Sequence, residues 1–358
     1  MNTWGENFKL SIFGESHGEG IGVVIDGIPS GFSVDMEKVN EQMKRRAPGR
    51  STTATARKEA DQVNILSGFL DGKTTGTPLC GVIYNTNTIS KDYNGDLLRP
   101  SHADYTAICK YGESRDFRGG GHFSGRITAP LVFAGAIARQ ILEEKGIFIG
   151  SHIGNIGKVY DKDFDPVNID KELLKDLSSK DFPVIDETIE EKMREEVETY
   201  KRDLNSVGGS VEVAVSGIGA GFGSPFFGSV ESRLSSMMFS IPAVKGIEFG
   251  MGFDFSESNG KDANDEFYIE NGVIKTKTNN NAGINGGITN GMPITFRIAL
   301  KPTPSIASKQ NTVDISKMEN TEIEIHGRHD PCIVPRAAVV AEAATAVTIL
   351  DIILTEQR

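Results

Sequence analysis

Cysteine is scarce in this chain of 358 residues, which contains only Cys80, Cys109 and Cys332. An odd number of widely spaced cysteines does not indicate a disulfide framework. The C-x-x-C and H-E-x-x-H patterns of common zinc sites are absent from the sequence. We therefore expect reduced thiols, no metal centre and a cytoplasmic protein.

The chain also has fewer basic than acidic residues. It contains 38 lysines and arginines and 49 aspartates and glutamates, which gives a net charge of −11. This balance argues against a general nucleic-acid or membrane-surface binder. The start of the chain lacks a basic-then-apolar targeting pattern, and the most apolar stretch, 337–354, is interrupted by Glu342 and Asp351. We expect no membrane span and no nucleic-acid partner. Any phosphate site must therefore be a local cluster of basic residues.

A glycine-rich loop at 118–126 reads Arg-Gly-Gly-Gly-His-Phe-Ser-Gly-Arg. Consecutive glycines do not favour a helix or a strand, but they let a backbone approach another group closely. The pattern predicts a helix over 131–145, with Thr128 and Pro130 suited to a first turn. Free N–H groups, the helix dipole and the arginines at both ends of the loop favour an anionic ligand. A disordered RNA-binding segment is the alternative, and the apolar helix disfavours it.

Two earlier segments carry further candidates. His17 lies among small residues at 14–18, which leave its imidazole little local cover, as a ligand-binding group would need; a structural histidine is the alternative. Cations cluster at 44–50, at the end of a helix predicted over 34–46. They complement the helix dipole, but their number exceeds what capping requires, so we favour an anion site.

The rest of the chain predicts an alternation of strands and helices. Strand patterns occur at 63–68, 78–84, 208–215 and 293–300. The segment 159–205 is charged, contains no glycine and includes an amphipathic helix, so we read it as a peripheral excursion of a single domain spanning 1–358. The Asn- and Gly-rich segment 279–291 predicts an ordered loop or a mobile lid. The helix predicted over 335–354 is almost uniformly apolar, which places it in the interior.

Seven segments taken in order resemble the chorismate synthase family: 14–18, 45–49, 99–104, 119–126, 240–246, 301–305 and 327–332. Each is weakly specific alone, but seven in register over nearly the full length are highly specific. The resemblance implies an α+β fold, a single-domain β-α-β sandwich with long helices packed between antiparallel sheets. It also implies a homotetramer.

The resemblance further implies an activity. Members of the family convert 5-enolpyruvylshikimate 3-phosphate into chorismate and phosphate, in the shikimate pathway of aromatic amino acid biosynthesis. This anti 1,4-elimination needs reduced FMN, although the overall reaction changes no oxidation state. NADPH is a candidate reductant of the flavin.

Residue roles follow from the same resemblance. A substrate with one phosphate and two carboxylates needs several guanidinium groups, and the family match assigns this role to Arg46, Arg50, Arg126 and Arg328. The match assigns proton handling near the flavin and the leaving phosphate to His17 and His102, loss of the ring proton to Asp330, and an orienting role to Ser16 and Ser124. The expected flavin contacts are Phe123, Ser124, Gly125, Pro242, Ala243, Gly286, Lys301, Pro302, Thr303, Pro304, Ser305 and Arg328. Many members carry Arg at the position of His122 and Ala at that of Gly125.

Two other readings remain open on the residues alone. A transferase acting on a phosphorylated metabolite would also need clustered arginines, and it would require a second co-substrate. A flavin- or RNA-binding protein without catalysis would bind its ligand without releasing phosphate. Asp330 likewise has a structural alternative, as a carboxylate near a helix N-terminus paired with a neighbouring arginine.

Overall fold

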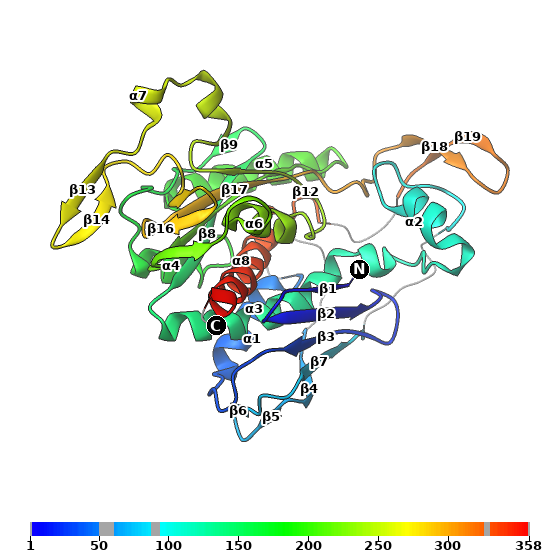
Figure 1. Ribbon diagram of the computed structural model, residues 1–358. Coiled ribbons are helices and arrows are strands. Elements are labelled where there is room, and N and C mark those ends of the chain that lie inside the picture. Colours follow the sequence, from blue (N-terminus) through cyan, green and yellow to red (C-terminus); the bar gives the residue numbers. More distant parts are fainter. Residues whose placement is uncertain (1, 50–60, 87–93, 326–329, 357–358) are drawn as a thin grey trace.

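The computed structural model describes residues 2–49, 61–86, 94–325 and 330–356. Helices lie between two five-stranded antiparallel sheets, as Figure 1 shows. This layering buries the apolar face of each sheet against the same helices. The expected α+β sandwich is confirmed.

The first sheet is built from the N-terminal quarter of the chain, and its strands follow the order β1-β2-β3-β7-β4. Its members are β1 (Thr3–Trp4), β2 (Lys9–Gly14), β3 (Gly20–Asp26), β7 (Leu79–Tyr84) and β4 (Asn64–Ser67). On β3 the alternate residues Ile21, Val23 and Ile25 are completely buried, which gives the sheet one apolar face. A small hairpin, β5 (Phe69–Leu70) and β6 (Lys73–Thr74), extends from it.

The second sheet has the strand order β12-β17-β10-β8-β9. Its members are β12 (Val244–Phe249), β17 (Ile294–Leu300), β10 (Gly209–Ser216), β8 (Phe148–Ile156) and β9 (Val159–Tyr160). On β10, Val211, Val213 and Val215 join the main core, whereas Ala214 packs with Phe164 on the other face. Both faces of this sheet are therefore covered by protein.

The layer between the sheets contains α1 (Met36–Arg46), α3 (Thr128–Glu144) and α8 (Val334–Glu356). The two longest of these pack closely where they cross, because a Cβ on Gly135 would lie only 2.4 Å from Ala343 Cα. Helix α8 is long and apolar enough to cross a membrane by length and composition, but 94% of that stretch is buried inside the protein. The interior position predicted for the last helix is confirmed.

The charged segment 159–205 covers the outer face of the second sheet, where α5 is visible at the top of Figure 1. It contains α4 (Lys171–Leu177) and α5 (Glu190–Arg202). Leu174 and Leu177 are buried in a second apolar cluster, and α5 buries Met193 and Val197. Its charged side chains face outward, as the amphipathic pattern predicts.

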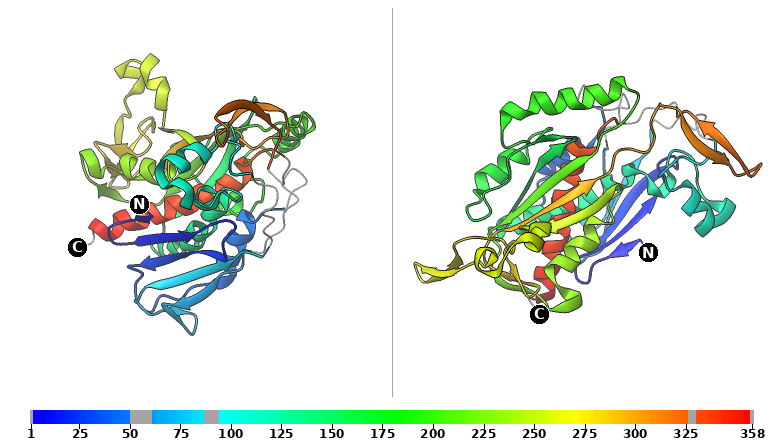
Figure 2. Two further views of the ribbon diagram at one scale, coloured as in Figure 1. Left: turned by 90° about the vertical axis from the view of Figure 1, so that its right-hand side faces the viewer. Right: turned by 90° about the horizontal axis from the view of Figure 1, so that it is seen from above.

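Shorter elements decorate the sandwich, as Figure 2 shows from two further sides. The helices are α2 (Asp104–Tyr111), α6 (Val230–Met238) and α7 (Gly260–Ala263), with 3-10 turns at η1 (Gly112–Ser114), η4 (Glu187–Ile189), η5 (Phe226–Gly228) and η6 (Gly252–Glu257). The strands are β11 (Ala220–Gly223), β13 (Phe267–Glu270), β14 (Val273–Thr276), β15 (Ile284–Asn285), β16 (Ile288–Asn290), β18 (Gln310–Asp314) and β19 (Glu319–Ile323). Strand β16 pairs with β11 on one side and with β15 on the other. Of the two alternatives expected for the segment 279–291, the structure therefore has the ordered loop.

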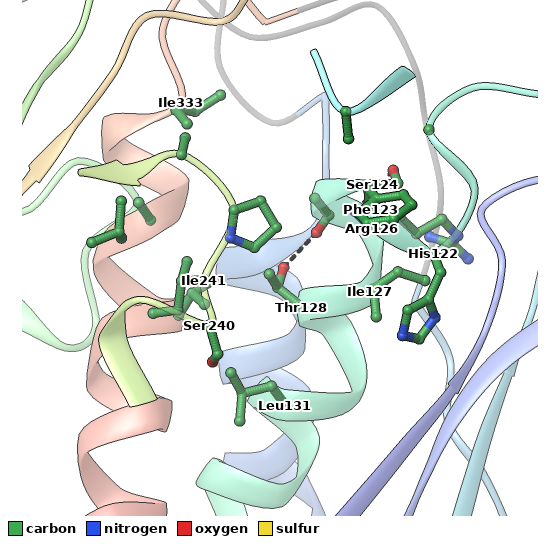
Figure 3. Close-up of a pocket in the computed structure, with 18 of the residues that line it drawn as sticks. His122, Phe123, Ser124, Arg126, Ile127, Thr128, Leu131, Ser240, Ile241 and Ile333 are labelled. Carbon is green, nitrogen blue, oxygen red and sulfur yellow. Dashed lines mark hydrogen bonds between the residues drawn. The ribbon is translucent and has the colours of Figure 1, made fainter. Parts of the chain in front are cut away.

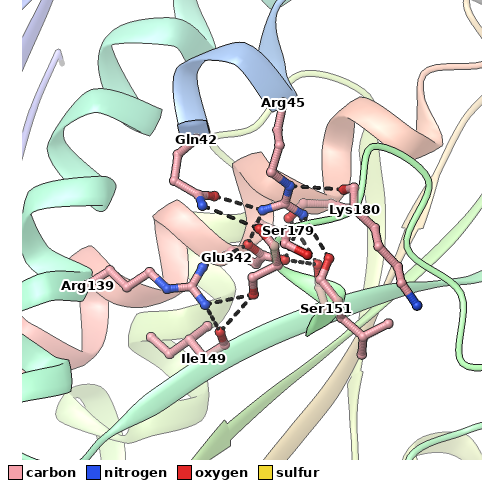
Figure 4. A network of polar contacts seen from close by, with 12 residues as sticks. Gln42, Arg45, Arg139, Ile149, Ser151, Ser179, Lys180 and Glu342 are labelled. Atoms are coloured by element: carbon pink, nitrogen blue, oxygen red, sulfur yellow. Dashed lines mark hydrogen bonds and ion pairs between the residues drawn. The ribbon is translucent and has the colours of Figure 1, made fainter. Parts of the chain in front are cut away.

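A buried polar network connects the middle layer to the second sheet (Figure 4). Arg45 Nη1 and Arg139 Nη1 lie 2.7 Å and 3.1 Å from Glu342 Oε2, and Ser151 Oγ donates to Glu342 Oε1 at 2.8 Å. The network corrects part of our reading of the cations at 44–50. Arg45 is a structural group that fixes the end of α1, since its charge is neutralised inside the protein.

Candidate active site

A cavity of about 990 Å³ opens where the glycine loop, the start of β12, the end of β17 and the start of α8 meet. Figure 3 shows Ser240, Ile241 and Ile333 on one side of it and His122, Phe123, Ser124 and Arg126 on the other. The side chains come from segments far apart in the sequence. The sandwich is therefore what brings them together.

The glycine loop adopts the close approach that its sequence predicts. Gly119 and Gly121 have φ of +69° and +52°, and a Cβ on Gly119 would lie 2.2 Å from His17 Cε1. The loop continues through two 3-10 turns, η2 (Gly121–Phe123) and η3 (Gly125–Ile127), and then α3 begins at Thr128. Ser124 Oγ accepts a hydrogen bond from Arg126 N at 3.3 Å at this helix entry.

His17 is more enclosed than we expected. Only 8% of the residue is exposed, because Gly119 of the distant glycine loop lies directly against the ring. Ser16 Oγ lies 3.1 Å from His17 Nδ1, and Ser16 N donates to Gly121 O at 3.1 Å. The neighbouring residues give the imidazole little cover, as expected, but a remote segment that the local sequence does not reveal covers it, and His17 lines the cavity.

His102 lies in the loop before α2 and also lines the cavity. Its Nδ1 is 2.7 Å from Asp104 Oδ1, and the same carboxylate pairs with Arg99. Arg99 Nη1 also donates to Gly119 O at 2.7 Å. The two predicted histidines are therefore both attached to the glycine loop, one by contact and one through Arg99.

Arg46 and Arg126 share one buried carboxylate. Asp61 accepts from Arg126 Nη1 at 2.8 Å and also pairs with Arg46. Burial alone would raise the pKa of Asp61, but the two arginines hold it below its usual value. Burial lowers the pKa of Arg46, and neighbouring Arg336 and Arg126 act in the same direction against Asp61.

Asp330 pairs with Arg336, which lies in the first turn of α8 and also donates through Nε to Arg46 O at 3.0 Å. Both Asp330 and Arg336 line the cavity. The arginine cluster and the predicted base therefore form one connected system. In it three guanidinium groups, of Arg46, Arg126 and Arg336, face the two carboxylates of Asp61 and Asp330.

The remaining wall is formed by the end of β17 and the turn before β12. Lys301 Nζ donates to Ser101 O at 2.6 Å. Burial and the nearby charge of Lys245 lower the pKa of Lys301. Thr303 Oγ1 is buried and, within the described part of the chain, has no hydrogen-bond partner. This wall therefore offers two cations and an unused hydroxyl to a ligand.

The cavity gathers most of the predicted site residues: Ser16, His17, Arg46, His102, Phe123, Ser124, Gly125, Arg126, Pro242, Ala243, Lys301, Thr303, Pro304, Ser305 and Asp330. Two others do not line it. Gly286 lies in the turn between β15 and β16, and the Pro302 ring lies against Gly208. Arg50 and Arg328 fall outside the described residues.

Four charged residues were missed by the sequence reasoning. Arg99, Lys245 and Arg336 line the cavity, and Asp61 pairs with two of its arginines. Arg99 belongs to a segment already singled out, so its proximity to His102 was a usable signal. Nothing local distinguishes Asp61 or Arg336 from a surface charge.

A partly apolar cavity of this size with clustered cations and histidines defines an enzyme site for a small anionic molecule. The chain belongs to the chorismate synthase family, whose family model, described as Chorismate synthase, matches residues 8–354. It is therefore a carbon–oxygen lyase acting on phosphate.

Known proteins resemble the chain over almost its entire length. The chorismate synthase of Methanobrevibacter smithii is 45% identical, covering 98% of this chain and 95% of that protein. The chorismate synthase of Pyrococcus abyssi is 46% identical, covering 98% of this chain and 97% of that protein. A solved structure described as a crystal structure of chorismate synthase matches with a TM-score of 0.77 and 28% identity, covering 99% of this chain and 93% of its own.

Proposed function

We propose that the protein converts 5-enolpyruvylshikimate 3-phosphate into chorismate and phosphate by an anti 1,4-elimination that requires reduced FMN. This reaction belongs to the shikimate pathway of aromatic amino acid biosynthesis. The observation that carries the proposal is the cavity, which brings His17, His102 and Asp330 together with the arginine cluster in a chain of this family.

The substrate's charge matches the cations of the cavity. Guanidinium groups bind planar oxyanions through paired N–H donors, and each has more donors than one carboxylate uses. Asp61 holds Arg46 and Arg126 side by side while leaving the cluster with net positive charge. These arginines would therefore bind the phosphate or a carboxylate without first having to be ordered.

The residues present also fit FMN. Thr303 Oγ1 has no partner in the described part of the chain, a Cβ on Gly125 would meet no atom within 4 Å, and Phe123 is 41% exposed at the cavity. Lys301 and Lys245 would hold the anionic end, and Phe123 with Pro242 and Ala243 would border the ring system. Reduced FMN would supply an electron-rich ring beside the substrate.

The protein groups have separate tasks in the elimination. The ring C–H electrons form a new double bond, the existing double bond shifts, and the C–O electrons leave with the phosphate. A carboxylate such as Asp330 can accept the ring proton, and protonated His17 or His102 can neutralise the departing phosphate. Arg336 pairs with Asp330 at the edge of the cavity and so holds its carboxylate in place.

The proposal includes a cytoplasmic homotetramer, as the family resemblance implies. Phe226 and Phe227 support an assembly, since 86% and 98% of their surfaces are exposed, and adjacent exposed aromatic residues often mark a protein interface. NADPH is proposed as a reductant of the flavin. Light scattering of the purified protein would test the assembly.

An anaerobic assay tests the reaction. With FMN reduced chemically in advance, we expect one phosphate and one chorismate for each substrate consumed, and no turnover with oxidised FMN. A requirement for a second co-substrate would select the transferase reading. Flavin binding without phosphate release would select the non-catalytic one. Replacing the chemical reductant by NADPH in air then tests self-reduction.

A further inference from the structure

Asp104 holds His102 and Arg99 at the same time. Its Oδ1 lies 2.7 Å from His102 Nδ1, and its carboxylate accepts from Arg99 Nε at 2.8 Å, Nη2 at 2.6 Å and the backbone N at 3.0 Å. The three side chains are largely buried, at 17% exposed or less. The loop thus has the arrangement of a histidine oriented by a carboxylate, with an arginine as counter-ion.

The backbone of this loop is also held by two contacts that do not involve the Asp104 carboxylate. His102 N donates to Arg99 O at 3.1 Å, and Lys301 Nζ donates to Ser101 O at 2.6 Å. Ser101 has a φ of +58°, a conformation that costs free energy for a residue other than glycine and persists only when its surroundings impose it. The position of the His102 ring is therefore strongly constrained.

The contacts determine which ring nitrogen is free. A neutral imidazole has one donor and one acceptor nitrogen, and an ionised carboxylate only accepts. The proton therefore resides on Nδ1, facing Asp104. In the described part of the chain Nε2 has no hydrogen-bond partner, and His102 lines the cavity.

Arg99 keeps the carboxylate from taking up the proton. Burial alone would raise the pKa of Asp104, but hydrogen bonds from Arg99 and His102 hold it well below its usual range. Asp104 therefore remains ionised while the ring gains or loses a proton. The His102 ring therefore exchanges protons with a ligand through Nε2.

We propose that Asp104 is a positioning residue for His102, fixing the Nδ1–H form so that His102 exchanges protons with the bound anion through Nε2 alone. In the forward direction the Nε2–H bond breaks, its electrons remain on nitrogen, and an O–H bond forms on the departing phosphate. Asp104 stays ionised throughout. This step rests on the proposed function, whereas the orientation of the ring does not.

Nitrogen NMR of histidine-labelled protein tests the orientation directly. The chain has six histidines, and the His102 signal is assigned by its loss in a His102→Gln variant. We expect neutral His102 in the wild-type protein to carry its proton on Nδ1. A proton on Nε2 would overturn the proposal, whatever reaction the protein catalyses.

Asp104→Asn tests the consequence, because an amide can donate to Nδ1 and favour the other tautomer. We expect a shifted His102 signal and kcat lowered by about 10²–10⁴-fold, with KM changed by less than about threefold. Asp104→Glu, which keeps an acceptor, should retain the wild-type tautomer and recover most of the rate. It also serves as the second variant if Asp104→Asn does not fold.

Asp116→Asn is the matched control. Asp116 accepts from Arg118 N at 3.0 Å, Nε at 2.8 Å and Nη2 at 2.9 Å, much as Asp104 accepts from Arg99. Among the described residues, however, the carboxylate bonded to His102 is that of Asp104 and not that of Asp116. We expect the nitrogen NMR signal of His102 in the Asp116→Asn variant to match that of the wild-type protein. An unchanged kcat in Asp104→Asn, or an equal signal shift in both variants, overturns the proposal. Wild-type protein that releases no phosphate refutes the proposed function instead and leaves the NMR result standing.

Discussion

At the scale of residues, Arg46 and Arg126 are distinguished from the other cations of the cavity by their shared partner, Asp61, whose side chain is completely buried. We predict that Arg46→Ala or Arg126→Ala weakens binding of the phosphorylated substrate. A lost charge-assisted bond costs ~1.5–3 kcal/mol, or roughly ten- to a hundredfold in affinity. Titration of folded protein by calorimetry measures the change.

Arg118→Ala is the control for these arginines, because Arg118 lies at the other end of the same loop, is 42% exposed and pairs with Asp116. Its binding should stay near the wild-type value. Equal losses in all three variants would show that general positive charge, and not the Asp61 pair, accounts for affinity.

Asp330 is the candidate base, and its pairing with Arg336 gives it a structural role as well. We predict that Asp330→Asn lowers turnover by about 10²-fold or more, because asparagine cannot accept the proton. The deficit should persist at saturating substrate with FMN reduced in advance. Turnover near the wild-type rate under those conditions would leave Asp330 with the structural role alone.

The family resemblance assigned His17, His102 and Asp330 to the site, and all three line the cavity. Their partners could not be predicted in the same way. Asp61 and Arg336 were missed because a carboxylate or guanidinium acquires its role only from groups that tertiary structure brings near. The cover over His17 was missed for the same reason, since Gly119 is remote in sequence.

At the scale of elements, Glu342 on α8 connects α1 and α3 to the second sheet (Figure 4). Burial alone would raise the pKa of Glu342, but Arg45 and Arg139 lower it, so the group is ionised. We predict that Glu342→Gln destabilises the protein by about 3–5 kcal/mol, because two buried guanidinium groups lose their carboxylate. Denaturant unfolding provides the measurement.

Glu143→Gln provides the comparison, because Glu143 pairs with the same Arg139 at 3.1 Å but is 22% exposed. Its loss should cost no more than about 1 kcal/mol. Similar losses in the two variants would contradict the view that the buried network fixes the middle layer.

His152 fastens the segment after β9 to the second sheet. Its Nδ1 lies 3.0 Å from Asp161 and its Nε2 lies 2.7 Å from Glu212, within the protein interior. Burial would lower the pKa of His152, but the two carboxylates raise it to about 9. Its charge therefore stabilises the fold fully below the unfolded pKa of about 6.5, and this contribution disappears as pH rises through about 9.

We accordingly predict that the free energy of unfolding falls between about pH 6.5 and 9, and that His152→Gln removes most of this slope. His122→Gln is the control, since the hydrogen bond of His122 Nδ1, at 2.8 Å, is to the backbone carbonyl of Gly14 and not to a carboxylate. Parallel pH profiles for wild type and His152→Gln would refute the assignment.

Apolar stretches of the sequence predicted the buried elements well. The helix expected over 335–354 is observed as α8 (Val334–Glu356), and the strand expected over 293–300 as β17 (Ile294–Leu300). Periodicity could not predict that Arg45 faces inward, because its partner Glu342 is 297 residues away along the chain.

At the scale of the whole molecule, the sandwich explains how an acidic chain provides an anion site. Its net charge is −11, yet basic side chains at or next to the ends of α1, α3, α8 and β17 line one cavity. The layer order followed from the family resemblance and not from composition. The ends of these helices and of this strand meet at one cavity only when the layers are assembled, so the sequence of each element alone could not predict the site.

The central claim is that one cavity binds both the flavin and the phosphorylated substrate. A crystal structure of the protein with oxidised FMN and 5-enolpyruvylshikimate 3-phosphate tests it most directly, because oxidised flavin should not support turnover. We predict both molecules in the cavity, with substrate oxyanions on Arg46 and Arg126 and the flavin beside Lys301 and Thr303. Either ligand bound elsewhere, or arginines that contact neither ligand, would contradict the account.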